Sequence, residues 1–78
     1  MDYAQRIKNL REDKDMNQTQ IAELLHVGQK TYSDYERRNC RIPVDSLIIL
    51  AKFYNVDMNY ICGVSDARHS FPVKNGAL

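Results

Sequence analysis

Apolar residues along this chain recur every three or four positions in short runs. This spacing lines them up on one side of an α-helix, whereas a half-buried strand would show strict alternation. The runs predict helices over residues 2–14, 18–25, 29–38, 44–54 and 57–62, and no stretch favours a β-strand. We therefore predict an all-α domain built from five short helices.

Residues with preferences for helix ends set the expected boundaries. Asn17 and Gln20 have the spacing of a capping box, and Asp57 is a good N-cap for the last helix. We expect the second helix to end at His26 in the left-handed conformation and Gly28 to cap the third. Two helices joined by about three residues describe a helix-turn-helix.

The third predicted helix has one apolar and one polar face. At about 100° per residue, Tyr32 and Tyr35 point inward, away from a polar side that carries Gln29, Lys30, Ser33, Asp34 and Arg37. Gln can bind adenine, Lys can bind guanine, and Asp can accept a hydrogen bond from cytosine in a DNA major groove. We therefore predict base reading by Gln29, Lys30, Ser33 and Asp34, and phosphate contacts by Asn17, Arg37, Arg38 and Arg41.

Length and charge fit a small site-specific binder. The chain has 78 residues, and residues 65–78 show no helical period, so we predict one domain over residues 1–64 and a C-terminal tail over 65–78. The net charge is only +1, but residues 29–41 hold four cations against two anions. A local basic stripe on a near-neutral protein suits a specific anionic partner better than general coating of nucleic acid.

Other function classes lack support in the sequence. The N-terminus has no apolar signal region, and no apolar run reaches the ~20 residues that span a membrane, so we expect a cytoplasmic protein without membrane association. The two cysteines form no C-x-x-C pair and match no metal-binding spacing with the two histidines, which predicts no metal and no other cofactor. We expect Cys62 in the core and Cys40 in an exposed loop. No catalytic constellation is visible, so an enzyme is not expected.

Several short motifs together resemble the phage repressor/Cro type helix-turn-helix regulators, also called XRE-like. They cover about Tyr3–Asp66 and comprise Leu10-Arg11, "NQTQIAELL", "TYSDYE", Ile42-Pro43, "LIILAKFYNV" and "YICG". The resemblance implies a compact lambda-repressor-like domain. It also implies a sequence-specific transcriptional regulator, a repressor, that binds double-stranded DNA as a homodimer on a near-palindromic operator.

The resemblance also implies individual roles. Gln18 matches a phosphate-binding position, and Arg11 and Glu36 match an ion pair that joins the first and third helices, with Arg11 also a candidate for a phosphate contact. Arg38 departs from the family, which usually has Gly after the third helix, so either the helix runs longer or the loop bends differently. Asp34 lies four residues after Lys30, so Lys30 is either free to read bases or paired with Asp34.

Two further surfaces are candidates for protein contacts. Ile49 and Phe53 lie off the core stripe of the fourth helix and, with Asn59 and Tyr60, make a candidate dimer patch. An alternative to the regulator is an antitoxin-like or other protein-binding helix-turn-helix module, in which the tail docks a protein partner through Phe71, Pro72 and Val73. A steep salt dependence of binding would favour DNA, and a shallow one the protein partner.

Overall fold

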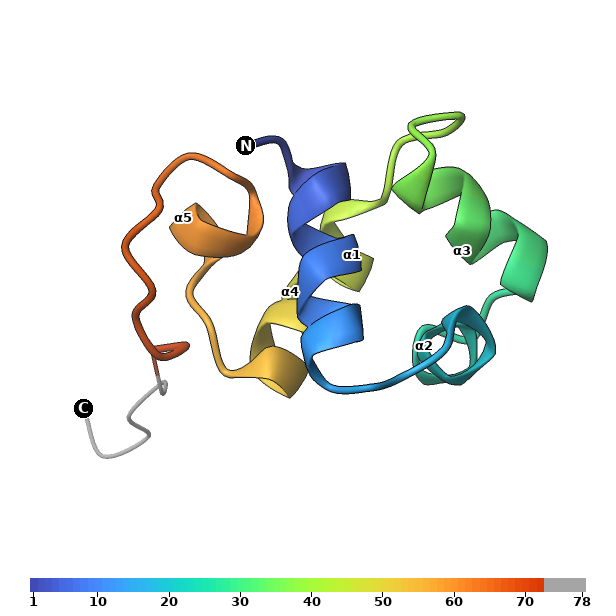
Figure 1. Cartoon of the computed structure of the whole chain (residues 1–78), viewed down its shortest axis with the longest axis horizontal. Coiled ribbons are helices and arrows are strands. Elements are labelled where there is room, and N and C mark those ends of the chain that lie inside the picture. The colour runs from blue at the N-terminus through green and yellow to red at the C-terminus, as the bar shows by residue number, and fades with distance from the viewer. Residues whose placement is uncertain (73–78) are drawn as a thin grey trace.

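The computed structural model describes residues 1–72, which form helices and loops without any strand. The five helices are α1 (Tyr3–Asp13), α2 (Gln18–Leu24), α3 (Gln29–Glu36), α4 (Val44–Tyr54) and α5 (Met58–Ile61). Figure 1 shows α1 and α4 at the centre, with α2 and α3 on one side and α5 with the chain after it on the other. The predicted all-α fold of five helices is confirmed, and no predicted helix end is wrong by more than two residues.

Side-chain caps define where these short helices begin. Asn17 Oδ1 accepts from the Gln20 amide at 2.8 Å, and Gln20 Oε1 accepts from the Asn17 amide at 2.9 Å, so the capping box is confirmed. Asp57 Oδ1 likewise accepts from the Tyr60 amide at 2.8 Å and caps α5. These bonds satisfy amide groups that the first turn of a helix otherwise leaves without partners.

The core lies where α1 meets the other helices. The largest of its fully buried side chains come from all five helices and one connecting loop: Ile7, Ile21, Tyr32, Leu50, Val56 and Ile61. Burial of such an aliphatic or aromatic side chain stabilises a fold by ~1.5–3 kcal/mol. Because α3 contributes Tyr32 to this core and packs against α1 and α2, the core sets the orientation of α3.

The end of α3 differs from the prediction. The helix was expected to reach residue 38 but ends at Glu36, and Arg38 adopts the left-handed conformation with φ of 64°. Of the two alternatives for Arg38, the structure therefore shows the bend in the loop and not the longer helix. Its guanidinium pairs with Asp2, with Nη2 lying 2.8 Å from Oδ1. The hydrogen bond from Arg38 lowers the pKa of the Asp2 carboxyl to about 2.

The expectation that Cys62 is a core residue is wrong. Helix α5 has only four residues, of which Ile61 alone is buried, and Cys62 follows as its C-cap. Cys62 is exposed and lines a surface cavity, although partial burial still raises the pKa of its thiol. Cys40 is exposed, as expected.

The chain from residue 65 to residue 72 lies against the helices. Arg6 Nη2 contacts Asp66 Oδ1 at 2.7 Å, the Asp57 amide donates to the His69 carbonyl at 2.9 Å, and Phe71 packs against the core. Phe71 in the suggested docking motif is thus already half-buried, and Val73 lies outside the described residues. The boundary after residue 64 stays a prediction. Within residues 1–72, no helix has the length and apolar character needed to cross a membrane.

Candidate nucleic-acid interface

The turn between α2 and α3 is fixed by the backbone. His26 has φ of 58°, which confirms the left-handed residue expected there. The His26 amide donates to the Glu23 carbonyl at 3.1 Å and the Val27 amide to the Ala22 carbonyl at 3.0 Å. Gly28 then begins α3 without a side-chain cap. The two helices pack closely against each other, so the turn and the core together hold α3 at one end of the molecule (Figure 1).

One face of α3 is anchored by two tyrosines. Tyr32 and Tyr35 are buried, and their rings meet edge to face with centroids 6.2 Å apart. This arrangement is favourable for aromatic pairs. Because these rings face the core, the other side of α3 is in solvent, where the structure places Gln29, Lys30, Thr31 and Arg37.

Ser33 is not on the exposed face where the helical wheel placed it. It is only 9% exposed. On a helix with 3.6 residues per turn, Ser33 lies about 60° from the buried Glu36, at the margin of the packed face. A short side chain at that margin is covered by its neighbours, which a wheel does not show. The expectation that Ser33 lies on the exposed face is therefore corrected, and little of its surface is left for a base.

Arg11 of α1 and Glu36 of α3 form a bidentate ion pair. Arg11 Nε lies 2.8 Å from Glu36 Oε2, and Arg11 Nη2 lies 3.0 Å from Glu36 Oε1. The third guanidinium nitrogen, Nη1, donates to the Met16 carbonyl at 2.9 Å. Burial raises the pKa of the Glu36 carboxyl, but the hydrogen bonds from Arg11 and its neighbours outweigh burial and hold that pKa below its ordinary value.

A chain of hydrogen bonds connects this ion pair to the first residue of α3. Gln18 Nε2 donates to Glu36 Oε1 at 3.1 Å, and Gln29 Nε2 donates to Gln18 Oε1 at 2.8 Å. Together these contacts link α1, α2 and α3, and they run from the buried Glu36 carboxylate to the exposed Gln29. The sequence indicated the Arg11–Glu36 pair, but it gave no signal for the Gln18–Gln29 contact. We infer that the buried pair acts mainly by fixing geometry, since such pairs contribute little net stability.

Lys30 and Asp34 are paired on the outer face of α3. Lys30 Nζ lies 3.4 Å from Asp34 Oδ2, and their side chains are 88% and 23% exposed. Asp34 also accepts from Asn39 Nδ2 at 3.3 Å, and this hydrogen bond is the main cause of its lowered pKa. An exposed pair is worth only ~0–1 kcal/mol, so Lys30 can leave Asp34 for a stronger acceptor. Asp34 holds the following loop in place as well as facing outward.

The predicted phosphate-binding residues differ in how accessible they are. Arg37 and Arg41 are exposed, and neither forms an ion pair within residues 1–72. Arg38 is exposed but engaged by Asp2, a partner 36 residues away that sequence reasoning missed. The Arg11 side chain is only 12% exposed and is taken up by Glu36. Asn17 and Gln18 lie at the start of α2, beside the first residue of α3 through the Gln29–Gln18 contact.

The sequence of this chain is similar to those of known proteins over most of its length. A family model described as helix-turn-helix matches residues 7–61. The HTH-type transcriptional regulator YobD of Bacillus subtilis, itself uncharacterised, is 36% identical over 64 residues, which are 82% of this chain and 57% of that protein. The cryptic phage CTXphi transcriptional repressor RstR of Vibrio cholerae is 32% identical over 72 residues, which are 92% of this chain and 63% of that protein.

A third relative and a solved structure agree with these matches. The HTH-type transcriptional regulator ImmR of B. subtilis is 33% identical over 63 residues, covering 81% of this chain and 50% of that protein. A crystal structure of a transcriptional regulator from Listeria innocua superposes with a TM-score of 0.75 over 96% of this chain and 65% of that one, at 24% identity. The chain thus spans between half and two thirds of the length of these relatives.

Proposed function

We propose, since this chain belongs to the helix-turn-helix family of transcriptional regulators, that it is a sequence-specific repressor that binds double-stranded DNA in the cytoplasm. The observation that carries the proposal is the outer face of α3. There exposed Gln29 is bound through Gln18 to the buried Glu36, and exposed Lys30 lies next to it, paired with Asp34. A rigidly held polar helix face at one end of a small domain fits a major groove.

In this proposal Gln29 and Lys30 read bases. The contact with Gln18 uses one of the two amide hydrogens of Gln29, which leaves the other hydrogen and the carbonyl oxygen for an adenine. The exposed Lys30 exchanges its partner Asp34 for guanine acceptors. Asp34 is expected to contribute less to base reading, since its carboxylate also accepts a hydrogen bond from Asn39. Ser33 is left out because it is buried.

Phosphate contacts in this proposal come from the exposed groups around α3. Arg37 and Arg41 supply charge, and the side-chain amides of Asn17 and Gln18 supply donors at the start of α2. Arg38 joins them when Asp2 releases it. Such contacts position a protein on the duplex and carry most of its salt-dependent affinity.

Arg41→Gln is expected to weaken binding to every DNA sequence by a similar factor. Because one phosphate contact is lost, the slope of log affinity against log salt concentration should become shallower by about 1. Fluorescence anisotropy with a labelled duplex at several salt concentrations measures this slope. Arg68→Gln is the matched control, since Arg68 lies against Tyr60 at the opposite end of the molecule from α3. Equal slopes for Arg41→Gln and wild type would remove Arg41 from the interface.

We further propose that the protein acts as a homodimer through α4. Ile49 and Phe53, one helical turn apart, are each 37% exposed. Of the other two residues in the candidate patch, Tyr60 is half-buried with its ring 3.7 Å from the Arg6 guanidinium, and Asn59 is exposed. The dimer proposal therefore rests mainly on the α4 pair. A symmetric dimer suits a near-palindromic operator.

Ile49→Glu is expected to shift a dimer to monomer, because it places a charge in the apolar patch. Sedimentation velocity over a range of protein concentrations measures the change. Val64→Glu is the control, since Val64 is an exposed apolar side chain outside the patch. An Ile49→Glu protein that sediments as wild type does at every concentration would refute the α4 interface.

A further inference from the structure

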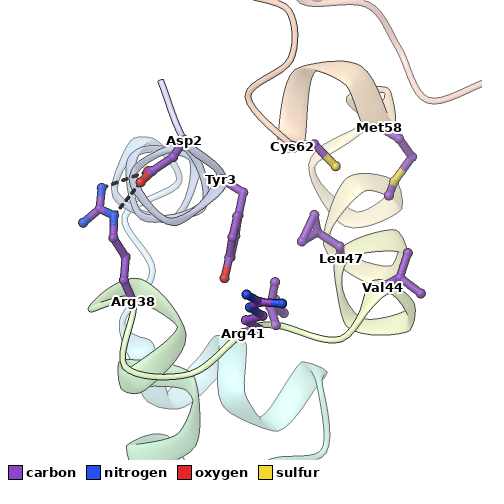
Figure 2. A pocket seen from close by; sticks show the side chains of 9 residues that line it. Asp2, Tyr3, Arg38, Arg41, Val44, Leu47, Met58 and Cys62 are labelled. Carbon is purple, nitrogen blue, oxygen red and sulfur yellow. Dashed lines mark hydrogen bonds and ion pairs between the residues drawn. The ribbon is translucent and has the colours of Figure 1, made fainter.

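A cavity of about 490 Å³ lies between the N-terminal end of α1, the loop after α3, and helices α4 and α5. Figure 2 shows Tyr3 directed from α1 toward the loop, with Leu47 and Met58 on the opposite wall. Ile42 and Val44 complete an apolar lining. Small-molecule sites in proteins are typically ~300–1,000 Å³, mostly apolar, with a few polar groups that orient the ligand. This cavity fits that description.

Of the charged residues around the cavity, one cation has no ion-pair partner within residues 1–72. Asp2 and Arg38 lie at one rim and form an ion pair with each other, drawn as dashed lines in Figure 2. Arg41 lies at the loop end of the cavity and forms no ion pair within residues 1–72. An apolar surface cavity with a single unpaired guanidinium at one end is complementary to a molecule with an apolar body and one anionic head.

We propose that this cavity binds an amphiphilic carboxylate, with its hydrocarbon part between Tyr3, Leu47 and Met58 and its carboxylate on Arg41. The guanidinium presents paired donors that match a carboxylate's two oxygens. No covalent step is involved. Cys62 lines the same cavity, so its thiol becomes less accessible when the site is filled.

Occupation of the cavity has a consequence for DNA binding, and this consequence rests on the proposed function. Arg41 is one of the proposed phosphate contacts, and a carboxylate bound to it competes with the phosphate. The ligand therefore acts as an inducer that releases the protein from DNA. Binding of the ligand itself does not depend on DNA, so the two claims are tested separately.

The first experiment measures alkylation of Cys62 by iodoacetamide in the Cys40→Ser protein, without DNA. Octanoate, below its micelle concentration, is the probe, and octanamide is its uncharged match. Octanoate is expected to slow alkylation at least threefold and saturably, and more strongly than octanamide does. In Arg41→Gln the preference for octanoate over octanamide should vanish, while the alkylation rate without either ligand should stay as in the Cys40→Ser protein.

Three outcomes would overturn the site. One is no protection by octanoate at any concentration. Another is equal protection by octanoate and octanamide in the wild-type background, which would mean that Arg41 plays no part. The third is protection that rises with protein concentration alone, which would mean that a second copy of the chain covers the cavity.

The second experiment adds octanoate to the protein bound to a labelled duplex. A lower affinity for DNA in the presence of octanoate, absent in the Val44→Asp protein whose cavity mouth carries a repelling charge, supports the inducer role. Protection of Cys62 without any change in DNA affinity would overturn the inducer role and leave the binding site standing. A protein that binds no DNA but is protected by octanoate would refute the proposed function alone.

Discussion

Glu36→Ala is expected to lower the free energy of unfolding by ~3–5 kcal/mol, the usual cost of breaking a buried ion pair by removing one partner. The substitution leaves the Arg11 guanidinium without its carboxylate in a site where the Arg11 side chain is only 12% exposed. It also removes the acceptor of Gln18, which holds Gln29 at the start of α3. Urea denaturation followed by circular dichroism measures the change in unfolding free energy.

Glu23→Ala is the matched control, because Glu23 is an exposed acidic residue on α2 and forms no ion pair within residues 1–72. Its effect should stay within the ~0.5 kcal/mol typical of surface substitutions. The pair Arg11→Met with Glu36→Leu should recover most of the stability lost in Glu36→Ala, since apolar replacement of both partners is often neutral. The DNA affinity of both Glu36→Ala and this double variant should be lower than that of the wild type, because Gln18 and Gln29 lose their anchor. A Glu36→Ala protein as stable as the control would contradict this account.

Gly63→Ala is expected to lower the free energy of unfolding by ~2–4 kcal/mol, from left-handed strain and overpacking together. Gly63 has φ of 80°, and a Cβ built there would lie 2.0 Å from the Met1 carbonyl oxygen. The N-terminus would have to move away. Met1 Sδ lies 3.4 Å from Arg6 Nε, so the movement would also disturb the buried Arg6.

Gly28→Ala provides the comparison for Gly63. A Cβ at Gly28 meets nothing within 4 Å, and its φ of −73° is accessible to any residue. Only a difference in N-cap preference remains, so the loss should stay under ~1 kcal/mol. Thermal and urea denaturation should therefore show a clearly larger loss of unfolding free energy for Gly63→Ala than for Gly28→Ala. Equal losses would show that the N-terminal residues do not pack on Gly63 as described.

The sequence predicted most of the fold because the relevant signals are local. The helical stripes, the Asn17–Gln20 capping box and the left-handed His26 each depend on residues within one or two turns. The end of α3 was placed too late for a related reason. A positively charged residue with a long side chain usually continues a helix, and the Asp2 partner that accompanies the bend at Arg38 lies 36 residues away.

The candidate site was only partly predictable for the same reason. The helical wheel gave the phase of α3 and thus the exposure of Gln29 and Lys30, but it could not show that neighbouring side chains cover Ser33. The Gln18–Gln29 contact spans two helices whose crossing is set by the whole core. The cavity beside Arg41 combines residues from position 2 to position 62, which no local pattern brings together.

The most direct test of the central claim is selection of bound sequences from a random double-stranded DNA pool at about 150 mM salt, with the wild type and Lys30→Ala run side by side. The account predicts that the wild type enriches an inverted repeat. In Lys30→Ala one base position in each half of that repeat should become relaxed, because a bidentate base contact is worth ~1–3 kcal/mol of discrimination. Failure of the wild-type protein to enrich any sequence would contradict the claim that α3 reads DNA.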